Sequence, residues 1–423
     1  MTIATYKTRD AEIFYSQKPD DLEIRRYMEE IYAQTSTISQ TFWNTASIDE
    51  RFWAGDQSLW NEIYSHIPSF RRKQFNFNKI RRVTNMITGY QRRNRKSTIC
   101  VPQESSDQLT ADQFTELLLW IENQDNMNHT LSSAFEGALV TGMNLLSLWV
   151  DYRNDPLSGD IKCDNIGYNG YLIDPYFKKY DLSDCNYIWT RKFLSKKQVI
   201  SLMPEHTDEI MQMHRKDTKD GKFQFMPENW NFSSKDLLSY DEFWYLDYRD
   251  ARMIVDQETN NQIEWKGPTE NLKFYLSRFP QLKEFKIKKQ TVRLCIRVND
   301  RVMFHGANPY NIDRYPFVPV IAYYAPELPY YEWRIQGVVR GLRDAQFLYN
   351  RRKQIELDIL ESQINSGVKV MEGSLIDDSD AFKTGQGQAM FIKKDAPLGM
   401  ASIEQFQAPQ IPPSMLQLSD LLS

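Results

Sequence analysis

The alternation of apolar and polar residues divides this chain of 423 residues into a helical start, a strand-rich middle and a helical end. Apolar residues at three- and four-residue spacing predict helices over residues 20–65 and 74–95, from Thr110 onward, and over about 128–144. Thr110 is a favourable N-cap ahead of its apolar stripe. The first third of the chain is therefore expected to be mostly helical.

Between residues 145 and 325 the pattern becomes typical of strands. LLSLWVDY and DIKCDNIGY flank a turn at 154–159 and predict a β-hairpin. Further strands are predicted in DEFWYLDYRDARMIVD, KKQTVRLCIRVNDRVMFHG and YPFVPVIAYYA, with a small helix near 195–218. Five prolines between residues 309 and 329 predict a rigid, extended connector. The expected fold class is α+β.

A long amphipathic helix is predicted from Trp333 to Asn365. Its apolar side consists of Ile335, Val338, Val339, Leu342, Ala345, Tyr349, Leu360 and Ile364. Its polar side follows three- and four-residue steps through Arg340, Asp344, Phe347, Arg351, Gln354, Asp358 and Glu361. About 33 residues at 1.5 Å each give a rod of roughly 50 Å. Such a rod needs neighbours along its apolar side, in a bundle or a ring of subunits, unless it is an ordinary long core helix.

The last part of the chain returns to short elements. VKVMEG and QAMFIKKD are strand candidates between 366 and 410. IPPSMLQLSDLLS then predicts a helix that begins at a proline and shows no C-cap before Ser423. We therefore expect the native chain to continue.

The composition indicates the general class of protein but does not indicate a reaction. Hydrophobic residues at 41% and charged residues at 26% indicate a globular chain, and a net charge of −4 does not favour a general DNA-coating protein. The four cysteines and five histidines are scattered, which predicts free thiols and no zinc site. We identify no signal peptide, and the longest apolar run, residues 138–150, is too short to span a bilayer.

One segment is strongly basic. Ten Lys or Arg residues and no acidic residue lie between Arg71 and Lys96. The candidates for a basic patch are Arg81, Arg82, Arg92, Arg93, Arg95 and Lys96. They could bind phosphates, or they could pair with acidic groups elsewhere in the chain or on neighbouring subunits.

Catalytic motifs are missing from the sequence. Gly385-Gln-Gly387 lacks the Lys-Ser/Thr that a phosphate-binding loop requires. Glu284-Phe285-Lys286 resembles half of a nuclease metal site, but no partner Asp precedes it. Aspartates 151, 155, 160 and 164 lack calcium-loop spacing and are better explained as acids of the hairpin. We expect no catalytic residue, no cofactor and no metal.

Three segments together resemble the large portal proteins, or head-to-tail connectors, of short-tailed phages, with crAss-like phages as one candidate group. They are Arg51–Trp60, the basic helix Asn78–Arg95, and Pro316–Ile321 followed by Gly337–Asn350. Their order and spacing over about 300 residues carry the resemblance. The departure from the family is at Ser423, since such portals continue past the second stem helix into a tunnel loop, a return to the wing and a crown.

The resemblance implies a portal fold with an α/β wing at 1–330, a first stem helix at 331–365, a small β-containing clip at 366–410 and the start of a second stem helix at 411–423. It implies a ring of twelve copies at one capsid vertex, with double-stranded DNA in its channel during packaging and ejection. The implied partners are the terminase motor, which hydrolyses ATP, a tail adaptor protein and the major capsid protein, with no membrane. The implied locations are the virion and, during assembly, the host cytoplasm.

The polar side of the long helix suggests how DNA could slide. A wall of uniform positive charge would hold phosphates tightly, whereas this side alternates in sign. The candidates for the channel wall or the subunit seam are Arg340, Asp344, Arg351, Gln354, Asp358 and Glu361. The alternatives are another virion protein, such as a tail adaptor or baseplate protein, and an enzyme such as a nuclease or glycosidase.

Overall fold

The computed structural model describes residues 21–56, 76–102, 107–152, 157, 159–213, 237–257, 261–299, 301–364, 368–377, 391–395, 403–405, 413 and 417. The chain divides into two compact units. Unit 1 combines Met1–Glu50 with Thr84–Arg340, and unit 2 combines Arg51–Val83 with Gly341–Ser423. Residues 51–83, which the sequence analysis grouped with the wing, therefore cluster with the chain that follows residue 340.

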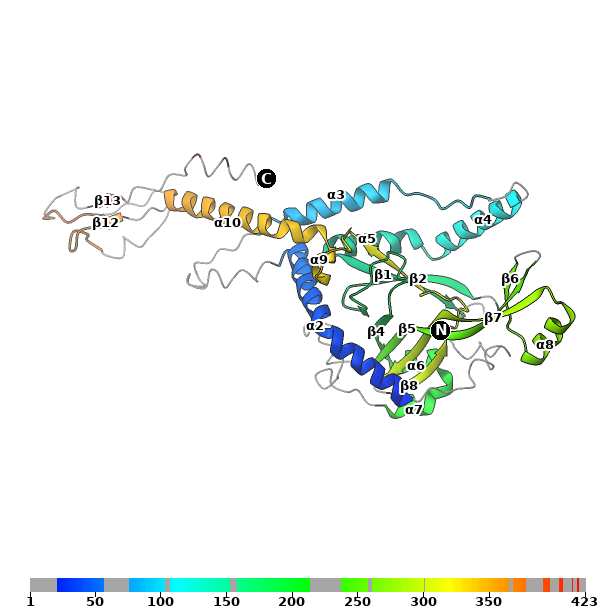
Figure 1. Cartoon of the computed structure of the whole chain (residues 1–423). Coiled ribbons are helices and arrows are strands. Elements are labelled where there is room, and N and C mark those ends of the chain that lie inside the picture. Colours follow the sequence, from blue (N-terminus) through cyan, green and yellow to red (C-terminus); the bar gives the residue numbers. More distant parts are fainter. Residues whose placement is uncertain are drawn as a thin grey trace. The chain divides into compact units, whose positions relative to one another are not determined.

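Helices and strands alternate in blocks along the chain (Figure 1). The helices are α2 (Asp21–Ala54), α3 (Lys79–Arg93), α4 (Gln108–Gln124), α5 (Met127–Thr141), α6 (Lys196–Leu202), α7 (Thr207–Gln212), α8 (Thr269–Arg278), α9 (Tyr331–Arg334) and α10 (Val338–Ile364). The strands are β1 (Met143–Asp151), β2 (Asp160–Ile166), β3 (Tyr171–Ile173), β4 (Tyr187–Ser195), β5 (Leu237–Asp256), β6 (Gln262–Glu264), β7 (Leu282–Val298), β8 (Arg301–Ala307), β9 (Phe317–Ile321), β10 (Tyr323–Tyr324), β11 (Ile335–Gln336), β12 (Val368–Val370) and β13 (Ile403–Gln405). The prediction of a mixed helix and sheet fold is confirmed.

Helix α2 buries a stripe of residues spaced three or four apart. The stripe includes Ile24, Met28, Ile31, Thr35, Ser39, Phe42, Ala46 and Asp49. The helix ends at Ala54 because Gly55 takes a φ of +96°, which side chains with a Cβ rarely adopt. The helix predicted over 20–65 is therefore shorter, and its part from residue 57 on lies outside the described residues.

The predicted hairpin is confirmed as β1 and β2, which pair antiparallel. Strand β9 joins the other side of β1 and completes a three-stranded sheet of order β2-β1-β9. The connector predicted at 309–329 is thus extended but also forms sheet bonds. Pro319 lies opposite Leu145 within this strand. An edge strand tolerates a proline because one row of its backbone groups needs no partner strand.

The larger sheet has the order β3-β4-β5-β7-β8, with β6 on β5, and all its neighbours are antiparallel. Both of its faces are covered near the middle of β5. On one face, the ring of Phe243 lies 6.0 Å from Tyr27 of α2. On the other face, Trp244 stacks on Tyr310 and meets the edge of Phe317 in β9. The core of unit 1 therefore lies on both sides of this sheet.

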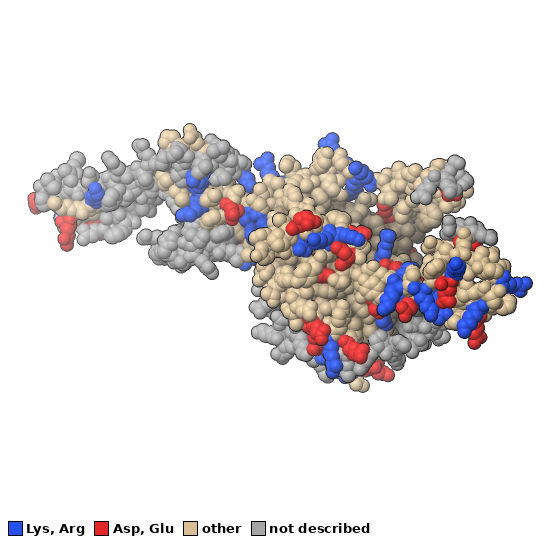
Figure 2. All heavy atoms as spheres, viewed as in Figure 1, with Lys and Arg blue, Asp and Glu red and all other residues tan. Residues whose placement is uncertain are grey.

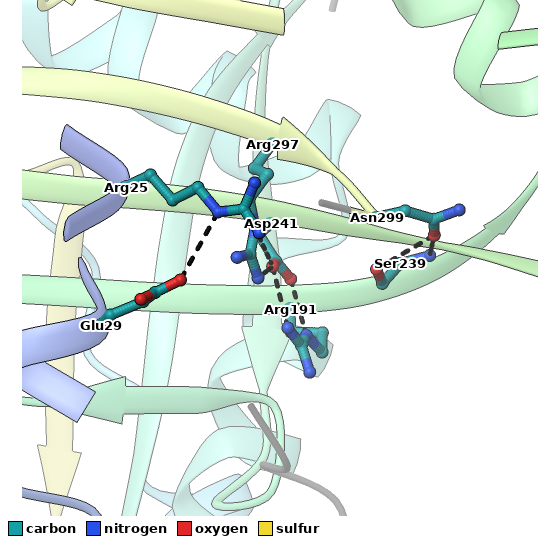
Figure 3. A network of polar contacts seen from close by, with 7 residues as sticks. All are labelled: Arg25, Glu29, Arg191, Ser239, Asp241, Arg297 and Asn299. Atoms are coloured by element: carbon teal, nitrogen blue, oxygen red, sulfur yellow. Dashed lines mark hydrogen bonds and ion pairs between the residues drawn. The ribbon is translucent and has the colours of Figure 1, made fainter. Parts of the chain in front are cut away.

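A charged group is buried inside the larger sheet (Figure 3). Asp241 of β5 lies opposite Arg191 of β4 and opposite Arg297 of β7. Arg191 donates two hydrogen bonds to the Asp241 carboxylate, at 2.7 and 2.9 Å, and Arg297 Nε donates a third at 3.2 Å. Burial alone would raise the pKa of Asp241, but the charges of Arg191 and Arg297 outweigh it and hold the pKa below its usual value.

Strands β5 and β7 continue beyond their neighbours as an arm, residues 247–291, that carries β6 and α8 (Figure 1). Glu264 accepts hydrogen bonds from Arg249 and Lys289. The hydrogen bond from Arg249 is the main cause that lowers the pKa of Glu264 to about 2. Lys289 also pairs with Asp313 at 2.8 Å, which ties the arm to the segment before β9.

The described part of unit 2 contains most of α10 and short β elements. The strand predicted in VKVMEG is confirmed as β12, which pairs with β13, an element that was not predicted. In QAMFIKKD, Ile392 forms a bridge with Leu375. Except for Pro413 and Gln417, which are helical, the helix predicted at 411–423 lies outside the described residues.

Candidate functional site

The long helix α10 begins at Val338, so the predicted start at Trp333 was wrong. Residues 331–334 form α9, and Ile335–Gln336 pair with Tyr323–Tyr324 as β11. Gly337 then lies so close to residues 139–140 that a Cβ would be 2.5 Å from the Val140 carbonyl oxygen. Because of the strand pairing of residues 335–336 and the close approach at Gly337, the helix begins only at Val338.

Arg340, in the first turn of α10, is held inside unit 1. Its Nε atom lies 3.2 Å from Oδ2 of Asp49, and its Nη1 donates to the Glu332 carbonyl oxygen at 2.7 Å. The Asp49 side chain is fully buried and that of Arg340 is 13% exposed. Arg340 was a candidate for the channel wall or the seam, but the structure gives it an internal ion pair.

In unit 2, two buried amides of α10 hold the start of α3. Gln346 Oε1 accepts from the backbone N–H groups of Lys79 at 2.9 Å and Ile80 at 3.3 Å, and its Nε2 donates to the Phe77 carbonyl oxygen at 2.6 Å. Asn350 Oδ1 accepts from the Phe77 N–H at 3.1 Å. The first N–H groups of a helix have no partner within the helix, so Gln346 supplies an acceptor that α3 lacks.

Sequence reasoning missed this role of Gln346 and Asn350. The available signal was their spacing: two amides four residues apart interrupt the apolar side of the predicted helix, beside Tyr349. Both side chains are buried, at 4% and 6% exposed. Buried amides require hydrogen-bond partners, so their position already implied a polar contact.

Gln346→Leu is expected to lower the free energy of unfolding of unit 2 by about 1–3 kcal/mol, because it removes the acceptor for two backbone N–H groups and a donor to a carbonyl. Chemical unfolding and hydrogen exchange at Lys79 and Ile80 would measure the effect, with faster exchange expected at both amides. Gln354→Leu on the same helix is the matched control, since Gln354 is half-buried and forms no hydrogen bond with the described residues at the start of α3. Equal effects of the two substitutions would contradict the assigned role.

One side of α10 is exposed and mixed in character. Helical spacing places Asp344, Leu348, Arg351 and Ile355 along it. Asp344 and Arg351 are exposed, and the apolar side chains of Leu348 and Ile355 are 44% and 40% exposed. This side therefore combines charges of both signs with unburied apolar surface.

The predicted apolar side of α10 is only partly packed. Val339 and Tyr349 are buried as predicted. Ala345 is exposed and Leu360 is 46% exposed, so the described residues of one copy do not cover this part of the apolar side. Among the other polar candidates, Gln354 is half-buried. Asp358 and Glu361 lie within α10, but their side chains are outside the described set.

The six basic candidates are all exposed: Arg81, Arg82, Arg92, Arg93, Arg95 and Lys96. Arg81 lies over the ring of Trp53 within unit 2, 5.1 Å from its centroid. Arg92 pairs with Glu136 at 3.3 Å within unit 1. Pairing within the described chain therefore occupies Arg92, whereas no ion pair within it holds Arg93, Arg95 or Lys96.

Two features bear on the enzyme alternative: the nuclease-like triplet at residues 284–286 and a cavity between the two sheets. Glu284 of the nuclease-like triplet pairs with Arg252 at 3.7 Å on the arm. A cavity of about 150 Å³ between the two sheets is lined by aromatic rings, including Trp149, Tyr240 and Trp244, and among the described residues that line it Glu242 is the one carboxylate. A glycosidase requires two carboxylates across the scissile bond.

Among the residues that the structure describes, no group of three or more His, Cys, Asp or Glu side chains is placed to hold a metal ion. No helix of the described chain combines the length and apolar character needed to cross a membrane.

Comparison with known families gives one extended match. The model of the phage P22-like portal protein family matches residues 29–422, which include α2 from residue 29 on, the basic helix α3, both sheets and α10. The match concerns the family as a whole and does not separate a crAss-like group. No curated protein matches the chain. The match covers far more than half of the sequence and agrees with the resemblance carried by Arg51–Trp60, Asn78–Arg95 and Gly337–Asn350. The chain therefore belongs to the P22-like portal protein family and is a subunit of the ring at the capsid vertex through which phage DNA is packaged.

Proposed function

We propose that α10 is the first stem helix of this portal ring, with residues 1–330 as the wing, 366–410 as the clip and 411–423 as the start of the second stem helix. The proposed ring has twelve copies. The observation that supports a stem role is the exposed side of α10, where Leu348 and Ile355 lie between Asp344 and Arg351. Apolar side chains left exposed along a helix favour a neighbour along its length.

Two sides of α10 would then have different roles. The side with Asp344, Leu348, Arg351 and Ile355 meets the next copy in the ring. Helical spacing places Gln354, Asp358 and Glu361 on an adjacent side, which faces the DNA. Acidic side chains there repel phosphates and prevent the tight binding that a basic wall would cause.

Asp358→Lys combined with Glu361→Lys tests the channel role. Rings should still form, and double-stranded DNA should pass through rings set in a nanopore several-fold more slowly at low salt. The difference should shrink as salt rises, because phosphate contacts weaken with salt. Glu372→Lys is the control, since Glu372 is exposed in the same unit but outside α10. Unchanged passage through intact variant rings would contradict the channel role.

The remaining parts of the proposal concern partners and place. We infer that the clip contacts first the terminase motor and then a tail adaptor protein, and that the wing contacts the major capsid protein. Arg93, Arg95 and Lys96 are candidates for binding phosphates of entering DNA. The same ring would conduct the genome during ejection, and assembly would take place in the host cytoplasm. Portal proteins are structural, and we propose that this chain performs no catalysis and needs no cofactor.

A further inference from the structure

Helix α4 in unit 1 leaves most of its apolar surface exposed. Ala111, at 8% exposed, is the one buried residue of this helix. Four large apolar side chains are between 48% and 73% exposed: Leu109, Phe114, Leu117 and Trp120. Ile99 and Val101, in the segment that leads to α4, are also exposed. Single exposed apolar residues are common, but a group of this size on one helix marks an interaction surface.

The charged side chains of α4 itself are all acidic, and Asp125 at its C-terminal end pairs with Lys162 of β2 at 3.3 Å. No Lys or Arg occurs between residues 97 and 152, and the surface over α4 in Figure 2 shows no blue. Asp112 and Glu116 are exposed, and helical spacing places them beside Leu109 and Trp120. The α4 surface, defined as Leu109, Asp112, Glu116, Leu117 and Trp120, is therefore acidic and apolar together.

The outer edge of β7 in the arm has the opposite character. Strand β8 pairs only with residues 293–298 of β7, so residues 282–292 have β5 on one side and, within the described chain, no strand on the other. Phe285 and Ile287 are 50% and 41% exposed. The arm is rich in charged side chains (Figure 2).

The basic residues of this edge are available for a partner. Lys283, Lys286 and Lys288 are exposed and form no ion pair with any described residue, although Asp250 lies opposite Lys288 in the ladder. The acid of the same stretch, Glu284, is paired with Arg252. Successive side chains of a strand point to opposite faces, so Lys283, Phe285 and Ile287 lie on one face of β7, whereas Lys286 and Lys288 lie on the other. The β7 edge, defined as Lys283, Phe285, Lys286, Ile287 and Lys288, therefore presents apolar and basic side chains to a partner that contacts both faces of the strand.

We propose that the α4 surface of one copy packs against the β7 edge of the next copy, and that this contact helps to close the portal ring. The inference rests on the ring assembly stated above. A ring needs a head-to-tail contact between two different surfaces of the same chain, and these two surfaces are complementary in charge and both apolar.

The same charges act against wrong pairings. Two β7 edges would bring lysines together, and lysine on an edge strand is a common defence against edge-to-edge aggregation. Two α4 surfaces would bring Asp112 and Glu116 against their own copies. Like-with-like contacts are therefore disfavoured, and the head-to-tail contact is the one that remains.

A mixing experiment tests this contact. The first variant carries Asp112→Lys and Glu116→Lys, and the second carries Lys286→Glu and Lys288→Glu. Alone, each variant presents like charges at every contact, so the concentration for half-maximal ring formation should rise about tenfold or more. An equal mixture restores complementary contacts in an alternating ring. Its half-maximal concentration should return to within about threefold of the unmodified protein.

The controls separate this inference from the function itself. Lys273→Glu, an exposed change on α8 of the same arm, should leave ring formation unchanged. Melting temperatures of all variants should stay close to that of the unmodified chain, since the exchanged side chains are exposed. If the unmodified chain forms no rings, the ring function fails. If the unmodified chain forms rings, two results would show that the proposed contact is wrong. In the first, each variant alone assembles as readily as the unmodified chain. In the second, the variants assemble poorly alone and the mixture does not restore ring formation. Normal rings that lose binding to the major capsid protein would assign the surfaces to that partner and also overturn it.

Discussion

Asp241→Asn is expected to lower the free energy of unfolding of unit 1 by about 3–5 kcal/mol, because it leaves two buried guanidinium groups without their counter-charge. Arg191 and Arg297 are 9% and 2% exposed, so water cannot replace the carboxylate. The fall in the unfolding midpoint, followed by tryptophan fluorescence, would measure the loss. Asp250→Asn is the matched control: it removes an exposed carboxylate from the same strand and should change stability by less than about 0.5 kcal/mol.

The Asp241 contribution should also depend on pH. The folded state holds the pKa of this carboxyl below its usual value, so its stabilisation is fully present above the unfolded pKa and is lost as the pH falls through the folded pKa. The difference in stability between the unmodified chain and the Asp241→Asn variant should therefore be constant near neutral pH and shrink below about pH 4. A difference that grows on acidification would contradict the ion-pair origin.

Arg340→Met is expected to destabilise unit 1 by about 3–5 kcal/mol, because the carboxylate of Asp49 stays buried after its cationic partner is removed. The substitution keeps an unbranched apolar stem and removes the guanidinium group. Thermal unfolding of the purified chain would show the loss, and ring formation should fall with it because fewer chains are folded.

Arg351→Met on the same helix is the comparison. Arg351 is exposed, so the variant should keep the melting temperature of the unmodified chain within one or two degrees while its rings form less readily. A large loss of stability in Arg351→Met, or none in Arg340→Met, would show that the two arginines are not placed as described.

Much of the fold could be predicted because the spacing of apolar residues along the chain follows which side of a helix or strand is buried. The segments LLSLWVDY and DIKCDNIGY on either side of a turn became β1 and β2, and the helical spacing of Ile80, Val83, Ile87 and Tyr90 became α3. The ends of elements were less predictable because tertiary contacts set them. The start of α10 depends on the pairing of Ile335 with Tyr324 and on the space beside Gly337, neither of which local sequence reveals.

The candidate site was harder to predict than the fold. Arg340 and Arg351 occupy equivalent positions in the pattern, yet the first meets Asp49, which lies 291 residues away in the sequence. Such a distant partner leaves no local signal. Leu348 and Ile355 were not part of the predicted apolar side, yet they are 44% and 40% exposed. We propose that the next copy of the chain covers them, and the sequence of one copy gives no local signal for such a contact.

The buried ion network of the larger sheet also bears on the order of folding. Its hydrogen bonds join residues separated by 50 and 56 positions, so neither can form before long loops have closed. Until β4 and β7 both flank β5, the carboxylate and the two guanidinium groups stay in water, where they favour no particular strand order. Once assembled, the network favours only the strand order in which β5 lies between β4 and β7. The charges of Arg191, Asp241 and Arg297 thus act late in folding, as a check on strand order rather than as its cause.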